Sequence, residues 1–569
     1  MDITSMQNRS SQKIIPSLLG INQSSNTHQP PKALVKLDIL CLILVCAGAG
    51  YLATMQGFDS IPLNADALAP FEEAKSLISN PNTHLFNIHV SRIASIFPDL
   101  TLNTLLQLLH PKAGFLEIFS HYAWCTSSLF LLLATLLTNE IQSRQTTLTA
   151  DSIKISLVTV SLLNISHQFN IAYSHFITPV HHGGNILNTL LLLFLSLHII
   201  KKPKRLVTRL FFIALIVLAT LSNKMSIFTA VFPAAILFLF YLKGKERRNQ
   251  LISIVLAALA GVTIGSLFNE QCATPEFNLL GTFSAFRQYF QLSWITSASA
   301  LFSIGTLLYV VKKKAPQSNL SIQTRAGFVA ISLSSLSYFI YLPMLTSSGE
   351  APLRYICIAY ALIVTFFVIY INRINKKFNA TILVAMIIAT LISFQSDTRP
   401  RINLANHQSL KQELIDRSEH IEPFKSDTAK FIQQMDYSSY LGLGDYWMSG
   451  TTLISNSKVQ IIPIHPTGVP DFWGATPQDI REKIKPLKRD HAYVLTDNEG
   501  FNEKFAERYG PPTITWNYDR KTREFSRENI KTNFKLLVYE NPDIYNKVRK
   551  KSKNFQRQCN PSLPNYSVR

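Results

Sequence analysis

One acidic segment, residues 57–117, holds most of the side chains that could do chemistry, and it lies between the first two apolar runs of the chain. Among its carboxylates, Asp66 precedes a predicted helix, and Asp99 stands in the tetrad Phe97-Pro98-Asp99-Leu100 ahead of leucines at helical spacing. A carboxylate close to a membrane surface can act as a general base. Either residue can instead cap a helix or complement its dipole, so both interpretations stay open at this point.

Histidines and a cation accompany these two carboxylates. His89 and Arg92 are three residues apart, so on a helix they share a face, and Arg92 can pair with a lipid phosphate or with Asp99. His181 and His182 precede two glycines, which let a ligand or another backbone approach closely. The alternative for the histidine pair is a simple turn at the end of a helix.

Four more residues end predicted spans on the same side of the membrane: Lys224, Glu350, Arg354 and Tyr355. Cations and carboxylates that converge at one interface are what the binding of a lipid phosphate requires. Lysine and arginine at helix ends also extend to the headgroups without any further role. No spacing of cysteine and histidine indicates a zinc site, so we expect neither a metal nor a cofactor.

The elements that must position these residues are apolar runs of about the length that crosses a membrane. We predict eleven spans, at residues 37–55, 120–138, 153–172, 185–200, 207–222, 225–242, 251–268, 291–311, 327–345, 355–371 and 379–394. The run 207–242 is too long for one span and is basic at both ends. We therefore expect it to cross twice, with a turn at Ser222-Asn223-Lys224.

Basic residues set the expected orientation. The connections at 201–205, 243–248, 312–314 and 373–377 are strongly basic, whereas most of those between them are poor in Lys and Arg. By the positive-inside rule the N-terminus is then inside and the C-terminus outside. The acidic segment, the histidine pair and Lys224 would share the outer face.

Four regions follow from this map: a disordered cytoplasmic tail at 1–36, an α-helical polytopic membrane module at 37–394 with an external loop at 56–119, an extracytoplasmic α/β domain at 395–545, and a flexible basic tail at 546–569 near anionic headgroups. The third region alternates short apolar strands with helical stretches. We predict the strands at 440–443, 459–464, 492–495, 513–516 and 536–539, and helices at 405–435, 476–484 and 501–508.

The formal net charge of +20 does not indicate nucleic acid as a partner. Much of the excess lies in connections between apolar spans, where basic residues fix orientation. The chain also lacks a glycine-rich phosphate-binding motif of the nucleotide-binding kind. We expect membrane lipids as partners, and no nucleic acid.

Several short motifs occur in order along the chain: Asp66-Ala67-Leu68 soon after the first span, Phe97-Pro98-Asp99-Leu100, His182-Gly183-Gly184, and a late Arg354-Tyr355. Together with about eleven spans, an acidic first external loop and an external C-terminal domain, they resemble the GT-C superfamily of membrane glycosyltransferases. Within it, the chain is similar to an uncharacterised bacterial branch. The resemblance covers most of the chain.

The resemblance implies an enzyme of the plasma (inner) membrane that moves a sugar from a polyprenyl-phosphate donor to an extracytoplasmic glycan, lipid or protein acceptor. The catalytic acid of the superfamily lies in the first external loop and maps onto Asp66, which stands alone where many members have a doubled acidic motif. Where members often carry Asp-Arg after the fifth span, this chain has Asn223-Lys224. The implied reaction is one inverting displacement, in which Asp66 takes the acceptor proton and Arg92, Lys224 or Arg354 holds the departing lipid phosphate.

Two other classes of protein stay open. A transporter or flippase of a lipid-linked glycan predicts ionisable residues deep within the spans, and only Asn164 and His167 approach that description. A non-catalytic envelope-assembly protein predicts an external domain that binds a partner, while the acidic loop is merely solvated.

Overall fold

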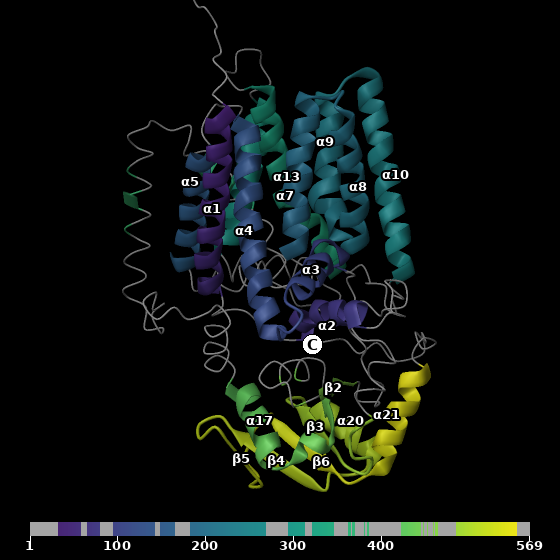
Figure 1. Ribbon diagram of the computed structural model, residues 1–569. Helices are drawn as coiled ribbons and strands as arrows, with labels where there is room; N and C mark the ends of the chain where they lie inside the picture. The colour runs from purple at the N-terminus through teal and green to yellow at the C-terminus, as the bar shows by residue number, and fades with distance from the viewer. Residues whose placement is uncertain are drawn as a thin grey trace, which may run out of the picture.

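The computed structural model describes residues 32–57, 65–79, 95–142, 148–165, 183–268, 294–312, 321–345, 423–444, 461–464 and 485–554, with single positions between 362 and 388 and at 448, 452 and 459. Figure 1 shows two bodies, a bundle of long helices and a smaller domain built on a β-sheet. The predicted tail up to residue 31 and the predicted helix 476–484 lie outside the described residues, as do the spans 355–371 and 379–394 apart from those single positions.

Apolar helices form the bundle: α1 (Lys32–Gly57), α4 (Phe115–Gln142), α5 (Leu148–Ile165), α7 (Gly183–Lys201), α8 (Leu206–Ser222), α9 (Phe232–Tyr241), α10 (Gly244–Phe268), α12 (Trp294–Lys312) and α13 (Ile322–Leu345). Within the described part of the chain, four segments are long and apolar enough to cross a membrane: Lys36–Met55, Phe115–Gln142, Gly183–Lys201 and Gly244–Ser266. Shorter apolar helices cover Leu206–Ser222, Ile227–Tyr241 and Leu301–Val310. The chain is therefore mostly helical, and its four long apolar helices indicate association with a membrane.

The run 207–242 forms two helices with the turn where the sequence predicts it. α8 ends at Ser222, and a short helical turn, η3 (Ile227–Val231), continues into α9. Asn223 is extended, and its side-chain oxygen accepts a hydrogen bond from the backbone N–H of Met225 at 2.9 Å. An Asn side chain that bonds the backbone two residues later stabilises a turn, which explains why the helix stops here.

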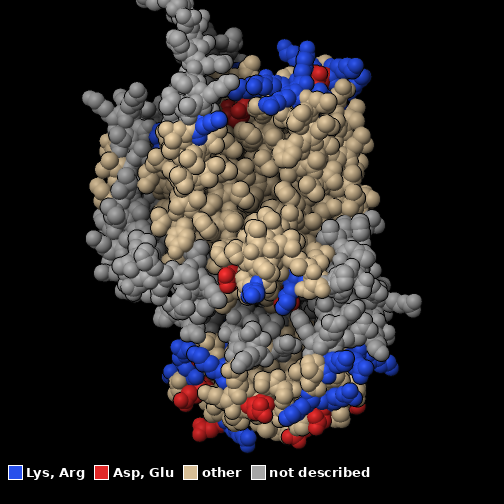
Figure 2. All heavy atoms as spheres, in the orientation of Figure 1, with Lys and Arg blue, Asp and Glu red and all other residues tan. Residues whose placement is uncertain are grey.

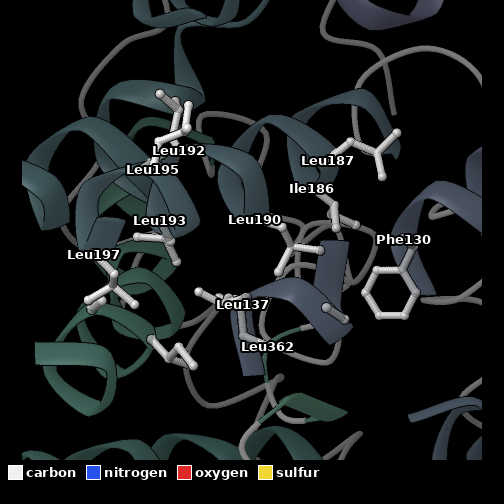
Figure 3. Packing of buried hydrophobic residues seen from close by; sticks show 14 of the residues in the cluster. Phe130, Leu137, Ile186, Leu187, Leu190, Leu192, Leu193, Leu195, Leu197 and Leu362 are labelled. Atoms are coloured by element: carbon white, nitrogen blue, oxygen red, sulfur yellow. The ribbon is translucent and has the colours of Figure 1, made fainter. Parts of the chain in front are cut away.

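The core of the bundle is centred on α7, which is buried along most of its length, as expected of a largely apolar helix surrounded by others. Figure 3 shows leucines of α7, among them Leu187 and Leu190, with Phe130 and Leu137 of α4 packed around them. A close contact between α8 and α10 depends on Gly261, because a Cβ there would lie 2.6 Å from the carbonyl oxygen of Val217. Small residues at such crossings let two backbones approach.

One end of the bundle is strongly basic. Figure 2 shows Lys and Arg gathered at this end, above a broad band without charge. The exposed basic residues include Lys201 at the end of α7, Lys202 after it and Arg247 in α10. Here too lies the buried Glu140 of α4, whose carboxylate is 3.4 Å from Lys201 Nζ and accepts from Gln323 Nε2 of α13 at 3.2 Å. The C-terminal ends of α4 and α7 and the start of α13 therefore meet at the basic end.

A layer of short helices lies at the opposite end, on the side of the sheet domain (Figure 1). It consists of α2 (Ala65–Ser79), the turn η2 (Ile96–Leu100) and α3 (Thr101–Leu109), and we call it the end layer. Its apolar side chains hold it in place. Ala74 of α2 packs with Ile96 and Leu100 of η2, and Leu68 of α2 packs with Leu106 of α3 and the start of α4.

In the described residues of the C-terminal domain, six strands form a mixed sheet in the order β2-β1-β3-β6-β4-β5. The strands are β1 (Leu441–Gly444), β2 (Ile461–Pro463), β3 (Ala492–Thr496), β4 (Ile514–Asp519), β5 (Glu524–Ser526) and β6 (Lys535–Tyr539). β1 pairs with β2 and β3 in parallel, and the remaining pairs are antiparallel. The predicted α/β domain is confirmed as a mixed sheet with helices, in which β5 was not predicted.

Helices cover both faces of this sheet. α17 (Pro423–Gln434) packs through Phe424 and Ile432 on one face, and α20 (Glu499–Tyr509) and α21 (Pro542–Asn554) pack on the other. Alternation along the strands produces the two cores, since Tyr493 and Leu495 face α17 while Val494 faces α20 and α21. The helix α21 continues to Asn554, past residue 546, where the sequence predicts a flexible arm.

Candidate functional site

The carboxylate of Asp99 is deeply buried, with 2% of the residue's surface exposed. It lies in η2, within the end layer. The phenol of Tyr122, in the second turn of α4, donates a hydrogen bond to its Oδ1 atom. The side chain of Ser95 also bonds the carboxylate. A buried carboxylate needs such donors because an unpaired one is costly to remove from water.

The backbone around Asp99 is held by side chains from two bundle helices. Ser222, the last residue of α8, accepts the Phe97 N–H on its hydroxyl at 2.7 Å, and its carbonyl accepts the Ser95 N–H at 3.1 Å. Asn188 of α7 donates through Nδ2 to the carbonyl of Phe97 at 3.0 Å. Ser95 is left-handed, with φ 40°, which turns the chain sharply into η2. The tetrad is therefore held by α7 and α8 in addition to the hydrogen bonds within its own segment.

Gly184, in the first turn of α7, allows this packing. A Cβ at that position would lie 2.6 Å from Oδ2 of Asp99 and 2.8 Å from Cδ of Pro98. Real Cβ atoms do not come so close to other heavy atoms, so only glycine fits. The structure thus joins two sequence motifs, Phe97-Pro98-Asp99-Leu100 and the glycines of His182-Gly183-Gly184, which lie far apart in the chain.

The environment of Asp99 raises its pKa to about 7. Burial is the largest cause, since it disfavours the charged form, and the hydrogen bonds from Tyr122 and Ser95 oppose it. The carboxylate also lies against the N-terminus of α7, where the unpaired N–H groups of a helix favour negative charge. Burial therefore favours the protonated form of Asp99 up to a higher pH than in an exposed aspartate.

Two other predicted residues lie in or beside the end layer. Asp66 is the second residue of α2, a first-turn position that suits an acidic residue. Lys224 is half-buried in the turn between α8 and η3, two residues after Ser222. Because Ser222 bonds the backbone at 95 and 97, this turn and the segment that carries Asp99 are direct neighbours.

The remaining predicted residues, His89, Arg92, His181, His182, Glu350, Arg354 and Tyr355, lie outside the described residues. The structure therefore brings together the segments that carry Asp66, Asp99 and Lys224. Among the described residues, no cluster of three or more His, Cys, Asp or Glu side chains could hold a metal ion.

Sequence reasoning missed the partners that fix Asp99. Tyr122 lies within a predicted span, where an aromatic residue is expected to pack, and nothing in its spacing indicates a hydrogen bond to residue 99. Asn185 and Asn188 offered a weak signal, because two amides in the first turns of an apolar helix must find partners. Asn185 accepts from Ser226 Oγ at 2.7 Å, and Asn188 bonds the tetrad.

Asp99 is enclosed, and its contacts with Tyr122 of α4 and Gly184 of α7 connect the end layer to the bundle. Its catalytic role stays a prediction. Asp66 lies at the start of a helix in that layer. Its role as a base stays a prediction.

Comparison of the chain with protein-family models, with curated proteins and with solved structures finds no match.

Proposed function

We propose that this chain is a membrane glycosyltransferase, which moves a sugar from a polyprenyl-phosphate donor to an extracytoplasmic acceptor. The end layer is the observation that supports this proposal most directly. It provides a helix with a carboxylate at its start, between an apolar body and a polar domain. A lipid-linked donor needs both surroundings, because its chain is apolar and its sugar phosphate is not.

We propose further that the membrane module crosses eleven times, with the basic end in the cytoplasm. The gathering of Lys and Arg at that end supports this orientation. The uncharged band of the bundle supports a position within lipid. The end layer and the sheet domain would then lie on the extracytoplasmic side of a plasma (inner) membrane.

In the proposed reaction Asp66 takes the proton from the acceptor hydroxyl as that oxygen attacks the anomeric carbon. The bond from this carbon to the lipid phosphate breaks, and the phosphate leaves with the electron pair. Lys224 would stabilise the charge that grows on the phosphate, together with Arg92 or Arg354. Asp99 acts as a positioning residue, because its burial and its bonds fix the layer that carries α2.

The test uses the full chain, purified into lipid discs and given a polyprenyl-phosphate sugar labelled in the sugar. We expect the wild-type chain to consume the donor when a suitable acceptor extract is present, and the Asp66→Asn variant to lose at least a hundredfold in rate, the usual range for a general base. The matched control is Glu72→Gln, which removes a half-buried carboxylate from the same helix. This variant should retain transfer.

Other outcomes assign the chain elsewhere. Donor that moves between leaflets unchanged would indicate a flippase. A chain that neither consumes nor moves the donor would indicate an assembly role. Normal transfer by a folded Asp66→Asn variant would remove Asp66 from the mechanism while leaving the transferase itself in place.

A further inference from the structure

The C-terminal helix α21 combines a buried apolar face with a strongly basic second half. Ile544, Tyr545 and Val548 are buried in the core of the sheet domain. After Asp543 the helix has no further acidic residue, and from Lys547 onward it also carries Arg549, Lys550, Lys551 and Lys553. Lys550 is exposed, whereas Lys547 lies over the ring of Tyr509 with Nζ 5.0 Å from the ring centroid. The sheet core accounts for the apolar residues but not for the charge.

The charges of the sheet domain are not evenly distributed. In Figure 2, Lys and Arg gather on the flanks turned towards the helix bundle, and Asp and Glu gather at the far end. Figure 1 shows α21 extending from the sheet towards the bundle. Because Ile544, Tyr545 and Val548 are packed in the domain core, the part of α21 that projects is the end after Val548. The basic surface therefore faces the level at which the bundle ends.

The outer boundary of the apolar band can be located from the end layer. Leu105, Leu108 and Leu109 of α3 are 51%, 59% and 64% exposed and form a stripe along one side of the helix. Such a stripe is typical of a helix in contact with lipid. Lys75 in α2 and Lys112 just after α3 are both exposed. The headgroup level therefore lies at the end layer, on the side of the sheet domain.

We propose that the basic second half of α21 binds anionic lipid headgroups, so that the sheet domain rests on the membrane surface next to the end layer. The charge of the helix matches this partner, since lysines and arginines close to an anionic membrane surface are attracted to it. The interaction requires no particular sugar or acceptor, so it is independent of the proposed glycosyl transfer.

The test is amide hydrogen exchange of the full chain in lipid discs, observed in peptides that cover α21. Discs of phosphatidylcholine alone are compared with discs in which phosphatidylglycerol replaces part of it. We expect α21 to exchange severalfold more slowly in the anionic discs, and the difference to disappear at high salt, where the Debye length shrinks from about 10 Å to about 3 Å. This comparison uses only the wild-type chain.

Two variants identify the residues. The triple variant Lys550→Gln, Lys551→Gln and Lys553→Gln should exchange at one rate in both kinds of disc. The charge-conserving control, with Lys→Arg at the same three positions, should keep the slower exchange in anionic discs. Equal exchange of wild-type α21 in the two discs would overturn the proposal, as would slowing that survives the Gln substitutions. Slowing by a soluble polyanion added to neutral discs, without any response to phosphatidylglycerol, would also overturn it.

Discussion

The substitution Gly184→Ala tests the contact on which the candidate site depends. The added methyl would meet Oδ2 of Asp99 at 2.6 Å, Cδ of Pro98 at 2.8 Å and Cγ of Asp99 at 2.9 Å. Neither partner is the free end of a flexible side chain. Asp99 is held by Tyr122, and Pro98 is a ring in a segment tied to Ser222. The methyl can therefore be accommodated only if α7 or the end layer moves.

The expected loss can be estimated from two opposing effects. Overpacking in a well-packed region costs about 1–3 kcal/mol, and three close contacts place this position in the upper half of that range. Alanine gains up to about 1 kcal/mol over glycine in a helix, and less in a first turn. The free energy of unfolding should fall by about 1–2 kcal/mol net.

The assay is equilibrium unfolding of the full chain in mixed detergent micelles. Gly48→Ala in α1 is the matched control, because a Cβ there has nothing within 4 Å and the chain should be as stable as wild type or slightly more so. Combining Gly184→Ala with Asp99→Ala should recover part of the loss, with a coupling energy of about 0.5–3 kcal/mol. If Gly184→Ala is as stable as Gly48→Ala, the packing of α7 against Asp99 is refuted.

Three further predictions concern the same fold. The raised pKa of Asp99, about 7 against an ordinary 3.8, means that between these values the folded chain holds a proton that the unfolded chain releases. Stability should therefore decrease as pH rises from about 4 to about 7, and Asp99→Asn should reduce that slope in unfolding curves recorded across this range. Ser222→Ala should lower the free energy of unfolding by about 1–3 kcal/mol, because it removes the hydroxyl that accepts the hydrogen bond from the Phe97 N–H. The control Ser266→Ala, at an exposed helix position, should change the free energy of unfolding little. In the same unfolding assay, Gly261→Ala should lower the free energy of unfolding by about 1–3 kcal/mol, because the added methyl would clash with the α8 backbone. The control Gly305→Ala should not lower it, because a Cβ there has nothing within 4 Å. Equal effects of the two substitutions would contradict the close contact between α8 and α10.

The sequence predicted those features that depend on local pattern. The two-helix form of 207–242 followed from its length and from basic residues at both ends, and the turn came at Asn223 as expected. Most strands of the sheet domain began or ended within a few residues of their predicted places, because runs such as 492–495 and 536–539 are apolar and short. The strand β5 was not predicted, because Glu524–Ser526 has only one apolar residue. That residue, Phe525, packs against Phe431 and Tyr518.

The contacts that build the site were not predictable in the same way. The sequence placed Asp99 before a helix, where a cap was as good an explanation as a functional carboxylate. Its burial depends on Tyr122, on Ser222 and on the missing side chain at Gly184, and these residues are up to 123 positions away. Periodicity reports which face of a helix is apolar, but it does not report which helix that face will meet.

The ties between the tetrad and the later helices also constrain how the chain is made. The segment 95–100 leaves the ribosome well before Ser222, whose hydroxyl and carbonyl hold it. At about 5–20 residues per second, this delay lasts on the order of ten seconds. During that time neither α7 nor the end of α8 is present to enclose the carboxyl of Asp99. The end layer must therefore complete its docking only after much of the bundle has been inserted, so its folding follows an order different from that of its synthesis.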